Sequence, residues 1–207
     1  MKQNGFFSLL YNALFLTFIL APLVVVMLVA FTDKGYISMP FHGASLRWFR
    51  AIVEDEDIIS AFWLSVRIAF AAATIGAALA VPAALAIARY RFPGRGAVTA
   101  FFLSPMIIPA IVIGIAFLRF LSLLGVGGSF WALVCTHVVI VLPYALRLTL
   151  SSVVGLDRDA ERAALSCGAS RFTAFRRLVL PMIMTGVAGG WLLSFIQSFD
   201  ELTMTIF

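Results

Sequence analysis

DAERAALSCGASRFTAFRRLVLP, residues 159–181, is a charged segment in a chain whose flanking sequence is strongly apolar. Six charged side chains stand in its 23 positions, together with a regular stripe of small residues. The stripe recurs at positions i, i+3, i+4, i+7 and i+8, a spacing that places its members on one face of a helix. Its members are Ala160, Ala163, Ala164, Cys167 and Gly168. Residues 160–168 are therefore predicted to form a helix with one smooth face.

Capping residues bound this predicted helix on both sides. Asp157 or Asp159 can cap its start, where negative charge also suits the helix dipole. Gly168 is the last small residue and can adopt the left-handed conformation that ends many helices. Ser170 is then expected to cap a second helix, and Pro181 marks the entry into the next apolar stretch.

A smooth helical face of this kind favours contact with another protein over burial. Small side chains offer little apolar area, so packing them into the chain's own bundle would stabilise it only slightly. They do allow a second backbone to approach closely, and the face is flanked by the charged residues Arg158, Glu161 and Arg162. Two interpretations follow: a contact helix for a partner protein, or an ordinary capped loop helix.

The composition of the whole chain is that of an integral membrane protein. Of its 207 residues 62% are hydrophobic and 12% charged, against about 45–50% and about 25% in soluble domains. Cys135 and Cys167 form no CxxC motif and no disulfide framework. His42 and His137 lie far apart without ligand-like neighbours, so no metal site is expected.

Five apolar stretches are long enough for the roughly 20 residues that a spanning helix needs. They are residues 6–31, 61–88, 97–122, 128–150 and 178–198. The first is much longer than the roughly 7–15 apolar residues of a signal peptide, so it is predicted to be an uncleaved span. Pro22, Pro82, Pro105, Pro109 and Pro143 lie inside these stretches. Kinks at Pro105 and Pro109 would suit either a moving bundle with a lined pathway or ordinary membrane-helix packing.

The distribution of basic residues predicts the orientation. With the N-terminus inside, the inner segments 1–5, 89–96 and 151–177 and the nearby Arg147 hold ten of the fifteen Lys and Arg residues. Because cytoplasmic loops carry the excess of Lys and Arg, the N-terminus and residues 159–181 are predicted to be cytoplasmic.

The longest connection, residues 32–60, is then predicted to lie outside. Its apolar residues Leu46, Phe49, Ile52 and Val53 precede an acidic run over 54–57. The pattern indicates either an interfacial helix with Trp48 near the headgroups or a solvated acidic loop.

The stripe and the residues after it resemble the EAA motif of permease subunits of binding-protein-dependent ABC importers. That motif reads EAA, three residues, Gly, and later Leu-Pro. Ala163, Ala164 and Gly168 match its spacing, and Leu180-Pro181 follows at the expected distance. The chain departs from the motif at the Glu position, which is Arg162, with Glu161 one residue earlier. The acidic contact is thus either shifted by one residue or replaced by a basic one.

The resemblance extends over nearly the whole chain. SVRIAFAAATIGAALAVPAALAIARYRFPGR (65–95) and SPMIIPAIVIGIAFL (104–118) resemble the second and third spans of these importers, and SFIQSFDELTMTIF (194–207) is similar to the spermidine/putrescine-type branch. The resemblance implies an all-α, polytopic membrane helical bundle of the type I ABC importer permease kind. Residues 1–207 would form one permease domain with a coupling-helix loop at about 151–177. Such permeases usually have six spans, so a sixth is expected beyond the five that the sequence shows.

The resemblance also implies partners in the bacterial cytoplasmic (inner) membrane. Residues 160–168, with Glu161 and Arg162 among them, would dock on one of two cytoplasmic ATPase subunits. A second permease subunit would complete the pathway, and a periplasmic binding protein would deliver the substrate. The sequence contains no GxxxxGK[ST] motif, since the glycines of 125–128 lack the lysine. ATP and Mg²⁺ are therefore expected on the ATPase, with no cofactor in this chain, no catalytic residues and no nucleic-acid partner.

Asp200 and Glu201, near the outer end of the last apolar stretch, are the first candidates for a substrate pathway, because ionisable groups at membrane depth are costly. With Phe195 and Phe199 they could hold a cationic amine by charge and cation–π contact. A solvated helix end is the alternative interpretation. The weaker candidates are Trp191, Ser194 and Gln197.

The predicted function is a permease subunit for a polyamine such as putrescine or spermidine. The alternative within the class is an importer of ferric iron, thiamine, a phosphonate or an amino-acid-like solute. A secondary transporter or channel would be expected to show inverted repeats and charges near the midplane, and a membrane enzyme would show clustered catalytic side chains. The sequence shows neither pattern.

Overall fold

The computed structural model describes residues 5–34, 36 and 43–206, and within these ranges the regular structure is helical. The long helices are α1 (Phe6–Ala30), α3 (Glu56–Arg89), α5 (Ala110–Leu123), α6 (Phe130–Val154) and α9 (Leu180–Phe199). The shorter ones are α2 (Arg47–Glu54), α4 (Arg95–Leu103), η1 (Ser104–Met106), α7 (Asp159–Ser166), α8 (Arg171–Ala174), η2 (Phe175–Val179) and α10 (Thr203–Ile206). Internal contacts divide the chain into two compact units, residues 1–62 and 63–207, with α3 beginning in the first and continuing in the second. Lys2 and His42 lie outside the described residues.

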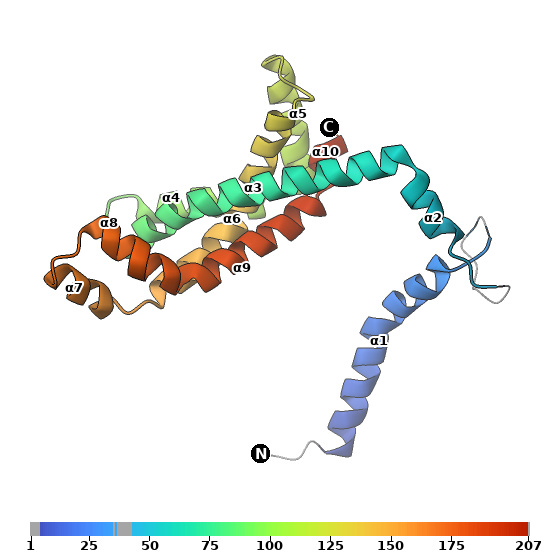
Figure 1. Cartoon of the computed structure of the whole chain (residues 1–207), viewed down its shortest axis with the longest axis horizontal. Coiled ribbons are helices and arrows are strands. Elements are labelled where there is room, and N and C mark those ends of the chain that lie inside the picture. Colours follow the sequence, from blue (N-terminus) through green and yellow to red (C-terminus); the bar gives the residue numbers. More distant parts are fainter. Residues whose placement is uncertain (1–4, 35, 37–42, 207) are drawn as a thin grey trace. The chain divides into compact units, whose positions relative to one another are not determined.

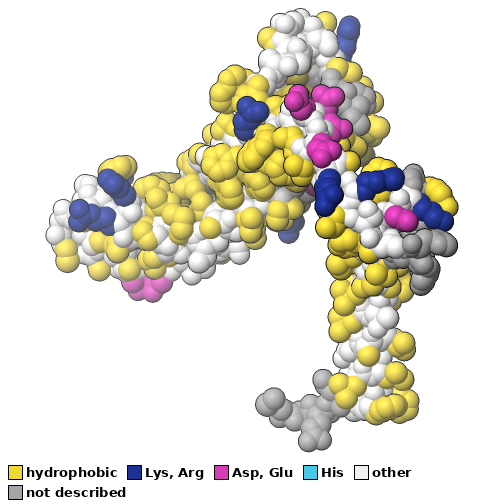
Figure 2. All heavy atoms as spheres, turned by 45° about the vertical axis from the view of Figure 1, so that its right-hand side comes forward, with side chains coloured by type: hydrophobic (Ala, Val, Ile, Leu, Met, Phe, Trp, Pro, Cys, Tyr) yellow, Lys and Arg dark blue, Asp and Glu magenta, His cyan; other side chains and the backbone are white. Residues whose placement is uncertain are grey.

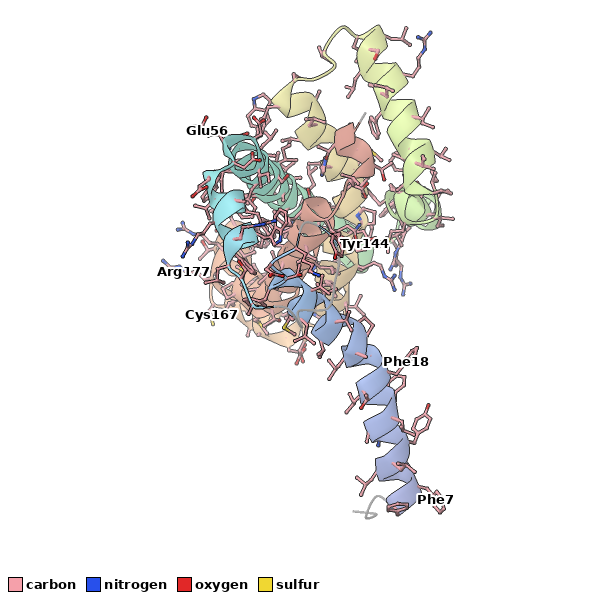
Figure 3. The ribbon with its side chains drawn as sticks, turned by 90° about the vertical axis from the view of Figure 1, so that its right-hand side faces the viewer. Phe7, Phe18, Glu56, Tyr144, Cys167 and Arg177 are labelled. Atoms are coloured by element: carbon pink, nitrogen blue, oxygen red, sulfur yellow. The ribbon has the colours of Figure 1, made fainter. Side chains whose placement is uncertain are left out.

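In the first unit, α1 is apolar on all sides. None of its 25 residues is buried, and Phe7 and Phe18 project from the helix (Figure 3). At a rise of 1.5 Å per residue the helix is about 38 Å long, enough for a hydrocarbon core of about 30 Å. Pro22 lies inside it without ending it. Such a helix needs lipid or another apolar surface around it.

The segment 46–57 forms a helix and then a cap. Arg47–Glu54 is helical as α2, with Phe49, Ile52 and Val53 exposed. The acidic run does not form a loop, because the Asp55 carboxylate accepts the backbone N–H groups of Asp57 and Ile58 at 3.0 and 3.1 Å. Asp55 thereby starts α3 five residues before the predicted span. The predicted helix is present over Arg47–Glu54, and its position at the membrane interface stays a prediction.

In the second unit, α3, α6 and α9 lie side by side (Figure 1). The face of α3 that is buried consists mostly of alanine, including Ala72, Ala80 and Ala84. Ala72 packs in one cluster with Val134 and Val141 of α6. Ala80 and Ala84 pack in a second cluster with α6 and α9 residues. The small side chains of α3 therefore allow three long helices to meet over most of their length.

The contact of α6 with α9 is close, because two glycines of α9 face α6. A Cβ on Gly186 would overlap the Ser152 hydroxyl and lie 2.7 Å from the Leu148 carbonyl oxygen. A Cβ on Gly190 would lie 3.0 Å from the Ala145 carbonyl oxygen. Gly186 and Gly190 are four residues apart, the small-xxx-small spacing that lets membrane helices pack backbone to backbone.

The predicted span over 97–122 is not one helix. Residues 95–106 and 110–123 form two helical pieces bent by 96°. Pro109 caps α5 with ψ of 132°, and Pro105 stands at the start of the 3-10 turn η1. A proline offers no backbone N–H and disfavours helical geometry in the residue before it. The expectation of a single kinked helix is wrong, since the two prolines divide the segment.

The helix of the last predicted span begins at Arg171, before the apolar stretch that starts at residue 178. The Ser170 hydroxyl accepts the Thr173 N–H at 3.1 Å, which confirms the predicted cap. From there helical structure continues through α8, the π-helical turn η2 and α9, so that 171–199 is one candidate span. Four helices of the described residues are long and apolar enough to cross a membrane, or five when the bent pair is one span. The predicted fold, an all-α polytopic membrane bundle, is confirmed.

The surface agrees with this fold. In Figure 2, hydrophobic side chains cover much of the visible face of residues 63–207, and Lys and Arg gather at the end that carries α7 and α8. Arg162, Arg171, Arg176 and Arg177 are exposed there. An apolar belt with a basic end is typical of a membrane protein whose basic end faces the cytoplasm.

Replacement of Gly186 by alanine should destabilise the α6–α9 contact. The added methyl group meets backbone, so the helices must separate, at a cost of about 1–3 kcal/mol. We expect a lower midpoint of thermal unfolding for Gly186→Ala in detergent. Gly189→Ala is the matched control, because its Cβ would lie 3.7 Å from Leu148 Cδ1, an ordinary contact. Equal midpoints for the two variants would contradict this account of the α6–α9 contact.

Candidate functional site

α7 is a short helix whose predicted stop at Gly168 is present, whereas its N-cap residue is Arg158, which makes no side-chain cap hydrogen bond. The Asp157 carboxylate accepts the Asp159 N–H at 3.0 Å at its start. At its end Gly168 has φ of 86°, and the Gly168 N–H donates to the Leu165 carbonyl at 3.0 Å. The Ala169 N–H donates to the Ala164 carbonyl at 3.1 Å. These two bonds form a Schellman motif, which confirms the predicted left-handed stop at Gly168.

The small face of α7 remains accessible. Ala160, Ala163, Cys167 and Gly168 are exposed, and Ala164 is half-buried. Cys167 is a free thiol at this end of the molecule (Figure 3). The described residues of the bundle therefore leave most of the stripe open to another molecule.

Glu161 and Arg162, the two residues at the departure from the EAA motif, have different surroundings. Glu161 Oε1 lies 2.9 Å from Arg89 Nη1, and these side chains are only 21% and 18% exposed. Arg162 lies 3.6 Å from Asp159 on the same helix, with both side chains exposed. The acidic residue is thus directed to the chain's own α3, and the basic residue to solvent.

A second bond joins α7 to the end of α3. Arg158 Nη2 donates to the Ala88 carbonyl at 3.3 Å. Together with the Glu161–Arg89 pair it holds the first turn of α7 against the last residues of α3. Sequence reasoning missed this connection, because Arg89 lies 72 positions from Glu161.

Toward the C-terminal end of α9, the candidate residues Trp191 and Phe199 form an aromatic stack with Phe195 between them. Trp191 stacks on Phe195 with ring centroids 5.5 Å apart, and Phe195 on Phe199 at 6.1 Å. From α3, Phe70 meets Trp191 edge to face at 5.6 Å. Trp191 Nε1 also donates to Thr74 Oγ1 at 3.1 Å. The stack therefore bridges α9 and α3.

Ser194 and Gln197 lie elsewhere on α9. The Ser194 hydroxyl is fully buried and donates to the Val141 carbonyl of α6 at 3.1 Å. Gln197 is half-buried and lies on the side of α9 opposite Phe195 by helical periodicity. The structure does not bring these two candidates to the aromatic stack.

The two candidate carboxylates follow α9 directly. Asp200 is exposed at the helix end, next to Phe199. Glu201 is half-buried, and its Oε1 accepts the Thr203 N–H at 2.9 Å at the start of α10. The Asp200 side chain thus makes no hydrogen bond or ion pair among the described contacts, whereas the Glu201 side chain bonds the first residue of α10.

Sequence reasoning also missed a buried polar pair between α6 and α9. His137 Nδ1 and Ser198 Oγ lie 2.8 Å apart, and the two residues are 2% and 4% exposed. His137 Nε2 has no hydrogen-bond partner among the described residues. Polar side chains inside apolar helices are the signal that could have suggested it. The described residues contain no cluster of three or more potential metal ligands.

Comparison with known proteins agrees with the resemblance seen in the sequence. Residues 76–207 match the family described as binding-protein-dependent transport system inner membrane component. The chain is 32% identical to the spermidine/putrescine transport system permease protein PotC of Haemophilus influenzae, over 99% of this chain and 77% of the relative. It is 29% identical to PotC of Escherichia coli, over 99% of this chain and 75% of the relative. It is 31% identical to the putrescine transport system permease protein PotI of Escherichia coli, over 92% of this chain and 70% of the relative.

Replacement of Ser198 by alanine should destabilise the α6–α9 pair at this end. The change removes the bond to His137 Nδ1 and leaves that buried ring without a described partner, a loss of about 1–3 kcal/mol. We expect a lower thermal midpoint for Ser198→Ala than for Ser122→Ala. The control hydroxyl is exposed and bonds only the Leu118 carbonyl of its own helix. A midpoint for Ser198→Ala as high as that of the control would contradict the assignment.

Proposed function

This chain belongs to the family of binding-protein-dependent transport system inner membrane components and is a permease subunit of an ABC importer, and we propose that α7 is the helix through which a cytoplasmic ATPase subunit drives it. The observation that carries the proposal is the exposed small face of α7. A partner can approach this backbone closely because Ala160, Ala163 and Cys167 stand out from the chain's own bundle. The bond from the Asp159 N–H to the Asp157 carboxylate at its start and the Schellman motif at its end favour the helical form before the partner binds.

The proposed assembly contains two cytoplasmic ATPase subunits, a second permease subunit and a periplasmic binding protein. ATP and Mg²⁺ act on the ATPase subunits, and this chain contributes to the translocation pathway. It lies in the bacterial cytoplasmic membrane with its N-terminus in the cytoplasm, as the basic segments favour. Nucleotide and substrate can drive transport only if each binds one conformation of the assembly better than the other.

The proposed substrate is a polyamine such as putrescine or spermidine. Three of the relatives with high similarity are permeases named for these compounds. The end of α9 offers the chemistry that a polyamine needs, since the stacked aromatic rings end at Phe199 and Asp200 and Glu201, which follow it, supply negative charge. An ammonium group gains from both, by cation–π contact and by charge pairing.

A bulky residue on the small face should block docking. We expect Ala163→Trp to reduce both co-purification of the ATPase subunit and ATP-dependent uptake to about a tenth or less, because a large ring keeps the two surfaces apart. Ala163 is exposed, so the variant should fold normally. This position is preferable to Gly168, whose φ of 86° would strain any larger residue.

Leu165→Trp is the matched control for Ala163→Trp. Leu165 is exposed on the same helix, and by helical periodicity it lies on the side opposite Ala163. The control should keep both co-purification and uptake near the wild-type values. Normal docking of Ala163→Trp, or an equal loss in both variants, would remove the small face from the coupling role.

Neutralising the carboxylates at the end of α9 should weaken polyamine transport. We expect Asp200→Asn to lower kcat/KM for putrescine uptake by about tenfold, the effect of losing one charged contact. Glu201→Gln should act in the same direction while keeping an oxygen that can accept the Thr203 N–H. Uptake is measured in proteoliposomes that contain the assembled importer.

Ser166→Gln serves as the control for this measurement, because it changes an exposed polar residue far along the chain from Asp200. Unchanged uptake in both carboxylate variants, with normal protein levels, would remove Asp200 and Glu201 from the pathway. Uptake reduced only by Glu201→Gln would assign the pathway contact to that residue alone.

A further inference from the structure

Glu161 connects α7 to the longest helix of the chain. Its partner Arg89 is the last residue of α3, and the atoms Oε1 and Nη1 lie 2.9 Å apart. Both side chains are about four-fifths shielded from solvent, at 21% and 18% exposure. The other ion pair of the described residues, Arg162–Asp159, has side chains 74% and 80% exposed. Water and salt screen the exposed pair far more than the shielded one.

Arg89 depends on Glu161 for its neutralisation. The second guanidinium nitrogen, Nη2, is buried and has no hydrogen-bond partner in the part of the chain that the structure describes. Glu161 supplies the carboxylate that balances this charge. Removing the carboxylate would leave a shielded guanidinium unpaired, which is a much larger perturbation than the loss of a surface pair.

α3 is a continuous helix, so a displacement at one point along it also displaces the neighbouring turns. It is 34 residues long, about 50 Å at the helical rise, and its alanine face is packed against α6 and α9. Pro82 lies within it without interrupting the helix. A displacement applied at Arg89 is therefore carried along the helix toward Thr74, which accepts a hydrogen bond from Trp191 of the aromatic stack.

We propose that the Arg89–Glu161 pair is the joint that makes α7 and α3 move as one body, so that Glu161 is a positioning residue for α3 and not a contact to the ATPase. This inference rests on the proposed docking of α7. When the docked α7 shifts, the pair transmits the shift to α3 and hence to the side of the aromatic stack formed by Phe70 and Thr74.

A second route from α7 exists and makes the inference testable. The backbone runs from α7 through α8 and the π-helical turn η2 into α9. If this covalent route alone carried the movement, the ion pair would be dispensable. The two routes therefore predict different results when the pair is broken and the backbone is left intact.

The test uses the complete importer in proteoliposomes, with Cys135→Ser as background so that Cys167 is the remaining thiol. The variants are Glu161→Gln, Arg89→Gln and the double variant. Arg91→Gln is the matched control, because it makes the same change at an exposed arginine two residues from Arg89 and outside the docking segment. Two quantities are measured: the yield of a thiol cross-link from Cys167 to the ATPase subunit, and the amount of putrescine transported per ATP hydrolysed.

We expect each single variant to keep the cross-link while transport per ATP falls by about tenfold, a coupling of the usual size for residues in contact. The double variant should lose no more than the worse single variant, because the two residues act through each other. The control should keep both quantities. Single variants with normal transport per ATP, or a double variant whose loss is the product of the two single losses, would overturn the inference.

The outcome separates this inference from the proposed function. Absence of the Cys167 cross-link in the importer with wild-type Glu161 and Arg89 would count against docking of α7 itself. A normal cross-link together with unaffected coupling in the single variants would leave docking in place. It would assign the movement to the backbone route through α8 and α9.

Discussion

Backbone-to-backbone packing of α9 on α6 is the constraint on which the rest of residues 63–207 depends. Gly186 and Gly190 leave no room for a Cβ against Leu148, Ser152 and Ala145. Lipid is as apolar as the helices themselves, so van der Waals packing at close range, together with a few buried hydrogen bonds, must hold membrane helices together. The Ser194 bond to Val141 and the Ser198 bond to His137 form along the same contact because the helices are this close. A wider separation would break both bonds.

α7 is held in a different way, at the edge of the bundle instead of in its core. Its small side chains bury little area, and its position depends on caps and on polar contacts to α3 through Glu161 and Arg158. This combination leaves the smooth face open and still fixes the direction in which it points. A docking helix needs both properties, because a loosely attached helix would absorb a partner's movement without passing it on.

α9 joins the two ends of the candidate machinery. Its N-terminal side continues from the helix that follows α7, with the π-helical turn η2 between them, and single π-turns inside helices often accompany functional sites. Its C-terminal side carries the stack of Trp191, Phe195 and Phe199 and then the two carboxylates. Contact with α6 along the length between them makes this a stiff connection. A movement of the proposed docking helix would therefore reach the proposed substrate contacts through α9.

The sequence by itself determined the features that depend on neighbouring residues: the apolar stretches, the helix at 160–168, its stop at Gly168 and the cap at Ser170, because hydrophobic length, helical periodicity and capping are local. It also contained the family resemblance. Only the tertiary structure decided that Pro105 and Pro109 break the third span by 96°, since a proline in a membrane helix can produce either a bend or a break. It alone showed that Glu161 pairs with Arg89 while Arg162 faces solvent. The partner of a charged side chain depends on which distant helix lies beside it, and that is set by close packing at positions such as Gly186 and Gly190.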